Sequence, residues 1–301
     1  GYIMEYNFEN KFVETDETII FFDNYINIDS PKEKFVIISH LSADNLAYLQ
    51  QATLLAKTFV SQNLFLLLQK LTKFELIANL NLDLKVLPYG FAVSVADSKI
   101  TALNSDDGLW GSMALYLEHD HQKLGYVAKF DIHGIHKKRI KAWKKFFSQQ
   151  KLDYLILGYQ DRDDSDNYLS KTGQLKNIEK TLEQADSTQI YLEMTPFDPE
   201  QLVKIDDLAH RLDYQIKWLP GYAELISYFK QLDFKEGSPA ATDKTLIQRE
   251  AQAHIADDLT ISSPLLAEDG KIDFMNNFAY PTEAELKEIL KYIAAKHVYF
   301  V

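Results

Sequence analysis

One short segment, Ser39-His40-Leu41-Ser42-Ala43-Asp44-Asn45, combines an imidazole and a carboxylate with small polar side chains. It follows an apolar run, Phe35 to Ile38, and precedes a leucine pattern typical of a helix. An imidazole and a carboxylate at the end of a strand can bind a metal ion or transfer protons. His40 and Asp44 alone do not complete a zinc site, because a catalytic zinc has three protein ligands and a water.

Other candidate ligands lie next to further apolar runs. Asp23 follows the predicted strand Thr18 to Phe22, a position typical of a strand-end turn. Asp107 lies in a polar segment just before the apolar run that starts at Met113. Oxygen ligands from Asp23 and Asp107 would suit magnesium or manganese better than zinc.

The elements that must position these residues alternate between strands and helices. Short apolar runs predict buried strands, and apolar residues at helical spacing predict amphipathic helices. Strands are predicted over 18–22, 35–38, 113–117, 124–128, 152–157, 189–192, 215–219 and 297–301. Helices are predicted over 136–147, 175–182, 202–212 and 283–295. Thr282 and Glu285 are spaced as a capping box at the start of the last helix.

Composition narrows the class of protein. The chain has 301 residues, 46% of them hydrophobic, so it can form one large domain or two ordinary ones. It has no cysteine, which excludes disulfides and thiolate metal sites. It shows neither a transmembrane run nor a signal-peptide pattern, so we expect a cytoplasmic protein that does not enter a membrane. A net charge of -12 disfavours tight, non-specific nucleic-acid binding.

Four segments follow known motifs, each with substitutions. Ser39 to Asn45 matches T-H-x-H-x-D-H, with His40 and Asp44 kept but Ser42 and Asn45 in place of two histidines. Asp106 to Ser112 matches D-H-S-x-x-G-S, with Asp107 at the histidine. Tyr126 to Gly134 matches Y-T-G-D-x-R-x-H-G, with Lys129 at the aspartate and His133 kept. Ser262 to Glu283 is similar to S-x-x-E-P-L and to the end of S-G-H-A-Y-x-x-E, with Asn276-Asn277-Phe278 at Ser-Gly-His. In this order the segments resemble the β-CASP branch of the metallo-β-lactamase superfamily, which contains ribonuclease J.

The resemblance implies an α/β fold: a four-layer αβ/βα sandwich with an inserted, reduced β-CASP-like cap. The sandwich would take residues 1–160 and 261–301, and the cap residues 161–260. The resemblance also implies a two-metal hydrolase site in which Asp23 orients His40, the residue at position 129 bridges the metals, and His133 shapes the cleft. Relatives carry an acidic residue after the strand 152–157, where this chain has Gly158 or Tyr159.

Lys129 is the substitution with the largest electrostatic consequence. An ammonium at the position of the bridging ligand would supply the positive charge that metals give in relatives, beside Asp44 or Asp107. An ion pair near 4 Å is worth ~4 kcal/mol at an effective dielectric constant of about 20, before desolvation. We therefore expect no bound cofactor. If a metal binds, His40, Asp44 and Asp107 would hold it, and manganese or magnesium would be favoured over zinc.

Two other clusters have simpler interpretations. Glu118-His119-Asp120-His121 looks like a run of metal ligands, but it falls at the tip of a predicted hairpin, which favours a solvated turn. Basic residues gather on the predicted helix 136–147: Lys137, Lys138, Arg139, Lys141, Lys144 and Lys145. They could contact phosphates, but the solvated face of an amphipathic helix is favoured, with Ile140, Trp143 and Phe147 in the core.

We expect a catalytically silent relative of metal-dependent nucleases that acts as a binding or interaction protein. Its partner would be a protein or a small molecule, and the resemblance implies a homodimer. Two alternatives stay open: a residual single-metal phosphodiesterase or ribonuclease, and a small-molecule binding protein that uses the old cleft. The enzyme needs bound metal, whereas the small-molecule binder needs a closed pocket with convergent polar groups.

Overall fold

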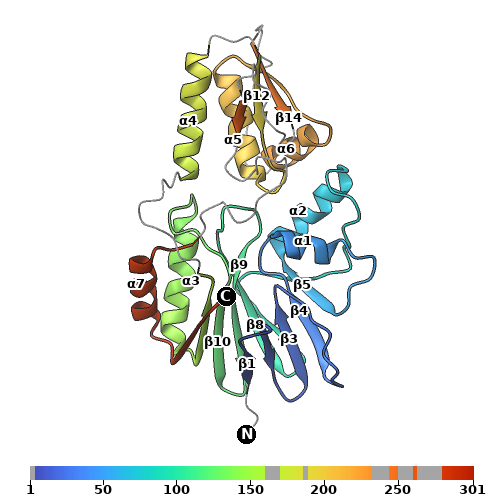
Figure 1. The fold of residues 1–301 in the computed structure, drawn as a ribbon, viewed down its shortest axis with the longest axis vertical. Helices are drawn as coiled ribbons and strands as arrows, with labels where there is room; N and C mark the ends of the chain where they lie inside the picture. The colour runs from blue at the N-terminus through green and yellow to red at the C-terminus, as the bar shows by residue number, and fades with distance from the viewer. Residues whose placement is uncertain (1–3, 160–169, 186–188, 232–243, 250–259, 263–279) are drawn as a thin grey trace. The chain divides into compact units, whose positions relative to one another are not determined.

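The computed structural model describes residues 4–159, 170–185, 189–231, 244–249, 260–262 and 280–301. The chain forms two compact units of a mixed α/β protein (Figure 1). The first unit takes residues 1–68, 79–167 and 279–301, and the second takes 69–78 and 168–278. The motif residues 263–279 lie outside the described residues.

The first unit contains two six-stranded sheets. The strands of one sheet are, in spatial order, β1 (Glu5–Asn7), β2 (Phe12–Glu14), β3 (Thr18–Phe22), β4 (Glu33–Ile37), β5 (Lys57–Ser61) and β6 (Lys85–Leu87). Those of the other are β16 (His297–Phe300), β11 (Tyr154–Leu157), β10 (Gln122–Val127), β9 (Met113–His119), β8 (Ser98–Asn104) and β7 (Ala92–Val95). The parallel pairing of β16 with β11 shows that the last residues of the chain complete the second sheet.

Apolar side chains from the two sheets meet in one core, with Ile20 and Ile37 from the first sheet and Leu115 and Tyr126 from the second. A further core lies between the second sheet and two helices, α3 (Lys137–Gln150) and α7 (Glu283–Ile293). On the first sheet, α1 (Ala43–Leu49) and the start of α2 (Gln62–Lys73) lie on the side away from the second sheet (Figure 1). This unit is therefore layered as helix, sheet, sheet and helix.

The helices of the second core confirm two local predictions. In α3, the apolar stripe of Ile140, Trp143 and Phe147 is buried, while Lys137, Lys138, Lys141 and Lys145 are exposed. In α7, the Thr282 side chain accepts from the Glu285 backbone and the Glu285 side chain accepts from the Thr282 backbone, which is the predicted capping box.

The second unit is a small parallel α/β unit. Its four-stranded sheet has the order β13 (Gln215–Lys217), β14 (Thr245–Arg249), β12 (Gln189–Glu193) and β15 (Thr260–Ser262). Every described pairing in this sheet is parallel. Its helices are α4 (Lys171–Gln184), α5 (Pro199–Arg211) and α6 (Tyr222–Gln231), of which the sequence predicted the first two.

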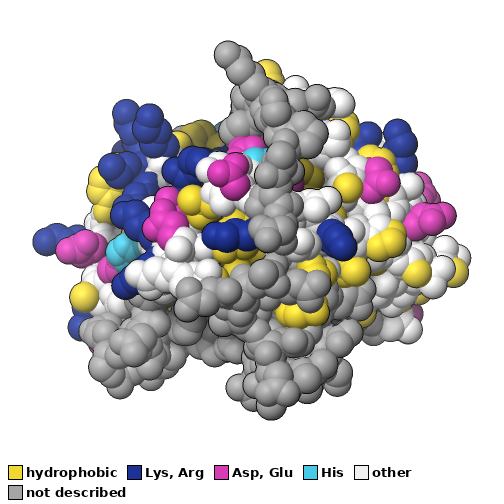
Figure 2. Space-filling model, turned by 90° about the horizontal axis from the view of Figure 1, so that it is seen from above, with side chains coloured by type: hydrophobic (Ala, Val, Ile, Leu, Met, Phe, Trp, Pro, Cys, Tyr) yellow, Lys and Arg dark blue, Asp and Glu magenta, His cyan; other side chains and the backbone are white. Residues whose placement is uncertain are grey.

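Within the described residues, no helix is both long and apolar enough to cross a membrane. Figure 2 shows one face of the molecule, on which basic, acidic and hydrophobic side chains are interspersed.

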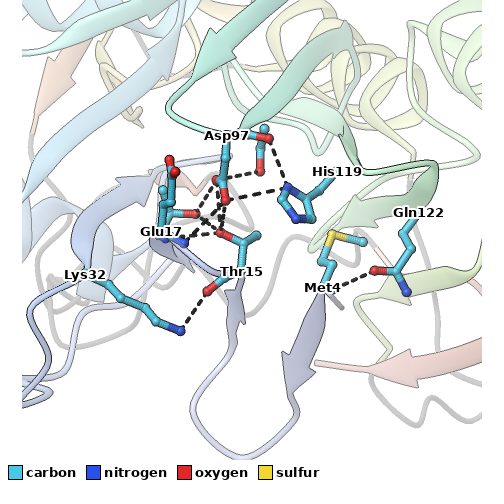
Figure 3. A network of polar contacts seen from close by, with 9 residues as sticks. Met4, Thr15, Glu17, Lys32, Asp97, His119 and Gln122 are labelled. Carbon is cyan, nitrogen blue, oxygen red and sulfur yellow. Dashed lines mark hydrogen bonds and ion pairs between the residues drawn. The ribbon is translucent and has the colours of Figure 1, made fainter. Parts of the chain in front are cut away.

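A polar network joins the two sheets of the first unit at the end where the hairpins turn (Figure 3). The Asp97 carboxylate accepts hydrogen bonds from the hydroxyls of Thr15 at 2.7 Å and Thr18 at 3.1 Å. The Nδ1 atom of His119 lies 2.9 Å from the backbone oxygen of Asp97. Asp97 therefore ties a turn of the first sheet to a strand of the second.

The prediction of a fully solvated turn is wrong for His119, whose exposed fraction is only 7%. Asp120 and His121 both have positive φ angles, 46° and 65°, so these two residues alone make the turn. His119 is still part of strand β9 and faces inward, where it meets Asp97.

Candidate functional site

Four chain segments meet at one edge of the two sheets. Asp23 follows β3 and His40 follows β4, and these neighbouring strands are parallel, so their carboxyl ends lie side by side. The Met113 backbone N–H donates to the Ser39 oxygen at 2.9 Å, which joins the loop before β9 to the segment containing His40. The Asp131 N–H donates to the Asp106 oxygen at 2.7 Å, which joins the segment after β10 to the same loop. The fold therefore brings together most of the residues that the motifs single out.

Asp23 is the centre of the hydrogen bonding. Its carboxylate accepts from the Ser39 backbone N–H at 2.7 Å, the Ser39 hydroxyl at 2.6 Å, the Asn45 amide at 3.0 Å and the Tyr126 hydroxyl at 2.6 Å. Its φ angle is 56°, a left-handed conformation that a non-glycine residue seldom adopts. Asp23 is thus both a strand-end turn residue and a partner of His40, which combines the two predicted roles.

His40 is paired with Asp23 through its Nδ1 atom, which lies 3.5 Å from Oδ2 of Asp23 and 3.0 Å from the Ser39 hydroxyl. Burial alone would raise the pKa of Asp23, but the charge of His40 and the hydrogen bonds from His40, Ser39 and Tyr126 lower it below its usual value. Burial alone would lower the pKa of His40, but the Asp23 carboxylate raises it above the usual value. Each of the two groups therefore favours the charged form of the other.

Asp107 and Lys129 are both buried, with exposed fractions of 1% and 5%. Burial raises the pKa of Asp107, and the positive charges of Lys129 and His40 offset part of that rise. The positive charge of Lys129 lowers the pKa of His40. Asp107, Lys129 and His40 are therefore electrostatically coupled and belong to the same site.

Two tyrosines belong to this site without having been predicted as site residues. Burial and the Asp23 charge raise the pKa of Tyr126. Burial and the charges of Asp107 and Asp23 raise the pKa of Tyr280, so its hydroxyl is electrostatically coupled to both carboxyl groups. Tyr126 and Tyr280 each matched a motif letter, so both positions carried a signal, although neither was selected as a site residue.

The other residues of the first motif have structural roles. The Ser42 hydroxyl accepts from the Asn45 backbone at 3.1 Å and caps α1. The Asn45 amide donates to Asp23 and, at 2.9 Å, to the His40 oxygen. Asp44 lies exposed in the first turn of α1, so we correct the prediction that it faces Lys129. The helix cap turns Asn45 toward the site, and its neighbour Asp44 consequently points toward solvent.

His133 lies at the rim rather than in the buried cluster. Its Nε2 atom is 2.6 Å from Oε2 of Glu285, and its side chain is 46% exposed. Glu285 is also part of the capping box of α7. His133 therefore fastens the loop after β10 to the helix that follows Tyr280.

Gly158 is one of the two residues after β11, with Tyr159, at which the resemblance expects the acidic residue of relatives. A Cβ atom on Gly158 would lie 1.5 Å from the Ala128 oxygen and 3.2 Å from Cε1 of Tyr280. The backbone of Ala128 and the ring of Tyr280 thus take up the space that a side chain at 158 would need.

The described residues do not fit the two-metal centre that the family resemblance implies. Of the three predicted ligands, Asp44 is exposed, whereas the charge of the buried Lys129 acts on both His40 and Asp107. The part of the chain that the structure describes contains no group of three or more metal-ligating side chains. What the arrangement offers chemically is a histidine whose pKa is raised, a buried lysine and the carboxyl groups of Asp23 and Asp107.

The comparisons with known proteins support the fold alone. No protein-family model matches the chain, and no curated protein matches it. The structure is similar to the crystal structure of a protein of unknown function from Enterococcus faecalis V583. That similarity has a TM-score of 0.60 at 12% sequence identity, and covers 96% of this chain and 83% of the other.

Proposed function

We propose that this protein is a non-hydrolytic relative of the metallo-β-lactamase-fold nucleases that acts as a binding or interaction protein. In this proposal, the helix-sheet-sheet-helix unit is the sandwich of that family and the second unit is a reduced β-CASP-like cap. The convergence of segments carrying the degenerate motifs at one sheet edge supports the assignment.

The observation that carries the proposal is Lys129, which is buried and acts electrostatically on both Asp107 and His40. Two-metal hydrolysis needs a metal-activated water and charge stabilisation at both the attacking and the leaving oxygen. An ammonium that acts on two of the would-be ligands, His40 and Asp107, would also repel a divalent cation bound by them. Its positive charge also stabilises the charged form of Asp107, so this part of the protein can fold without a bound metal.

The surrounding residues support the same conclusion. Ser42 and Asn45, at the positions of two ligand histidines, are engaged in capping α1 and in bonding Asp23. Restoring an imidazole at either position would remove one of these contacts. In this proposal, the loop that carries metal ligands in the family has a structural role here.

The test is metal content and turnover of the purified full chain. After dialysis without added metal, we expect no stoichiometric zinc, manganese or magnesium, and hydrolysis of RNA, DNA and a simple phosphodiester at background. Turnover that a chelator and His40→Ala both abolish would overturn the proposal and support a residual single-metal phosphodiesterase.

A further inference from the structure

Helix α3 concentrates positive charge in a chain that is acidic as a whole. From Ile132 to Leu152 the chain has seven lysines and arginines and no aspartate or glutamate, although its net charge is -12. We call the five lysines of the helix the α3 basic face: Lys137, Lys138, Lys141, Lys144 and Lys145. All of them except Lys144 are exposed, so the α3 basic face is open to a partner.

The charges of the α3 basic face are not balanced by the described part of the chain. No ion pair joins any of its lysines to a described acidic residue, whereas on α7, which shares a core with α3, Lys287 pairs with Glu283 at 3.2 Å. Lys141 lies four residues from both Lys137 and Lys145, a spacing at which like charges on a helix repel. The first turn of α3 also lacks an acidic residue, although the helix dipole favours one there. Local charges that oppose the fold are typical of a functional surface.

The other side chains of α3 indicate which kind of anion fits. Trp143 and Phe147 are buried in the core, so they offer no exposed ring on which a nucleic-acid base could stack. Ala142, the one exposed apolar residue of the helix, is too small to anchor the face in a membrane. With a net charge of -12, the chain as a whole also repels an extended polyanion. A short acidic segment avoids this repulsion, because charges are screened beyond about 8 Å at physiological ionic strength.

We propose that the α3 basic face is the docking surface for a short acidic segment of a partner protein, whose carboxylates pair with the lysine ammoniums. The inference goes beyond the proposed function and holds whether or not the protein hydrolyses phosphodiesters. At ~1.5 Å of rise per residue, the helix spans about 12 Å from Lys137 to Lys145. An extended segment of about four residues covers that length. Because exposed ion pairs are individually weak, binding requires several of them at once and weakens as salt is added.

The experiment measures binding of a fluorescent oligo-glutamate peptide to the full chain by anisotropy. The double variant Lys141→Glu/Lys145→Glu should bind it about tenfold more weakly or worse, because two attractions become repulsions. Lys176→Glu/Lys180→Glu is the matched control: it makes the same change at the same spacing on α4, where both lysines are exposed. That control should bind the peptide as the wild type does. The peptide should also protect Lys141 and Lys145 from chemical acetylation, and leave Lys176 and Lys180 reactive.

Thermal melts should show that both double variants fold as the wild type does. If Lys141→Glu/Lys145→Glu fails to fold, Lys141→Gln/Lys145→Gln replaces it, because it removes the two charges without reversing them and should still weaken binding. No binding of oligo-glutamate, or an equal loss in the α3 and α4 variants, would overturn the proposal. So would tighter binding of oligouridylate, or of vesicles containing phosphatidylserine, that only the α3 variant loses, since the α3 basic face would then take another class of anion.

Discussion

Asp23 and His40 form a largely buried acid–base pair across the ends of two neighbouring parallel strands, with Oδ2 and Nδ1 3.5 Å apart. The same carboxylate accepts hydrogen bonds from Ser39, Asn45 and Tyr126. Asp23 is therefore saturated with donors from the protein itself. The charges at this sheet edge are balanced largely by side chains, and this balance makes specific mutations informative.

Replacing Asp23 by Asn should destabilise the protein by about 3–5 kcal/mol, because it strands the partner of a buried pair. It also leaves the hydroxyls of Ser39 and Tyr126 with a weaker acceptor. Urea unfolding measures the change. Asp44→Asn is the control: it removes the same charge from an exposed helix residue and should change stability by no more than about 0.5 kcal/mol. Equal losses in the two variants would show that the Asp23–His40 pair is not a source of stability.

The same pair predicts how stability depends on pH. The pKa of folded His40 is raised above its ordinary value of 6.5, so its contribution is complete below pH 6.5 and is lost as pH rises through the raised pKa. The pKa of folded Asp23 is lowered from 3.8, so its contribution is complete above pH 3.8 and is lost as pH falls through the lowered pKa. We expect the free energy contributed by the pair to be greatest between these values.

Urea unfolding of the wild type and of His40→Gln across this pH range tests the prediction. The stability difference between the two proteins should shrink on the alkaline side, as His40 loses its proton. A difference that stays constant from pH 5 to pH 9 would contradict it.

Lys129→Ala should destabilise the protein, because Asp107 would lose the nearby positive charge in a buried environment. Added manganese should restore part of the lost stability, and Lys129→Asp should gain more from manganese than Lys129→Ala does, since binding to the folded state stabilises it. Thermal melts with and without manganese measure both effects. Lys141→Ala, on the exposed face of α3, is the control and should melt as the wild type does, with or without metal. If Lys129→Ala behaves like that control, Lys129 does not replace the charge of a metal.

Asp97→Ala should cost about 3 kcal/mol or more, because it leaves the buried hydroxyls of Thr15 and Thr18 without their shared acceptor. Asp16→Ala, in the same turn but exposed, should have little effect. Hydrogen exchange of β2 and β3 would show whether Asp97→Ala lowers the stability of the turn between these strands, which Asp97 hydrogen-bonds. Similar melting temperatures for the two variants would mean that the network of Figure 3 contributes little to stability.

Local patterns predicted local structure well. The strand Thr18–Phe22, the apolar stripe of α3 and the capping box of α7 are confirmed, because each depends on residues close together in the chain. His119 was misjudged because the tight turn leaves it in the strand, and its partner Asp97 belongs to another hairpin. The bond from Tyr126 to Asp23 joins residues that are 103 positions apart, and no periodicity in the sequence reports such a contact.

The close packing around Gly158 also bears on how this protein could change over evolutionary time. A Cβ atom there would overlap the Ala128 oxygen at 1.5 Å, so an acidic side chain at 158 requires the main chain itself to move. A single substitution therefore cannot return a carboxylate to this position while the fold stays as it is. Laboratory evolution toward metal-dependent hydrolysis would have to shift Ala128 and Tyr280 first, and each such intermediate would lose stability before it gained a ligand. For a lineage that started from an active ancestor, the close packing around Gly158 would hinder the return of activity.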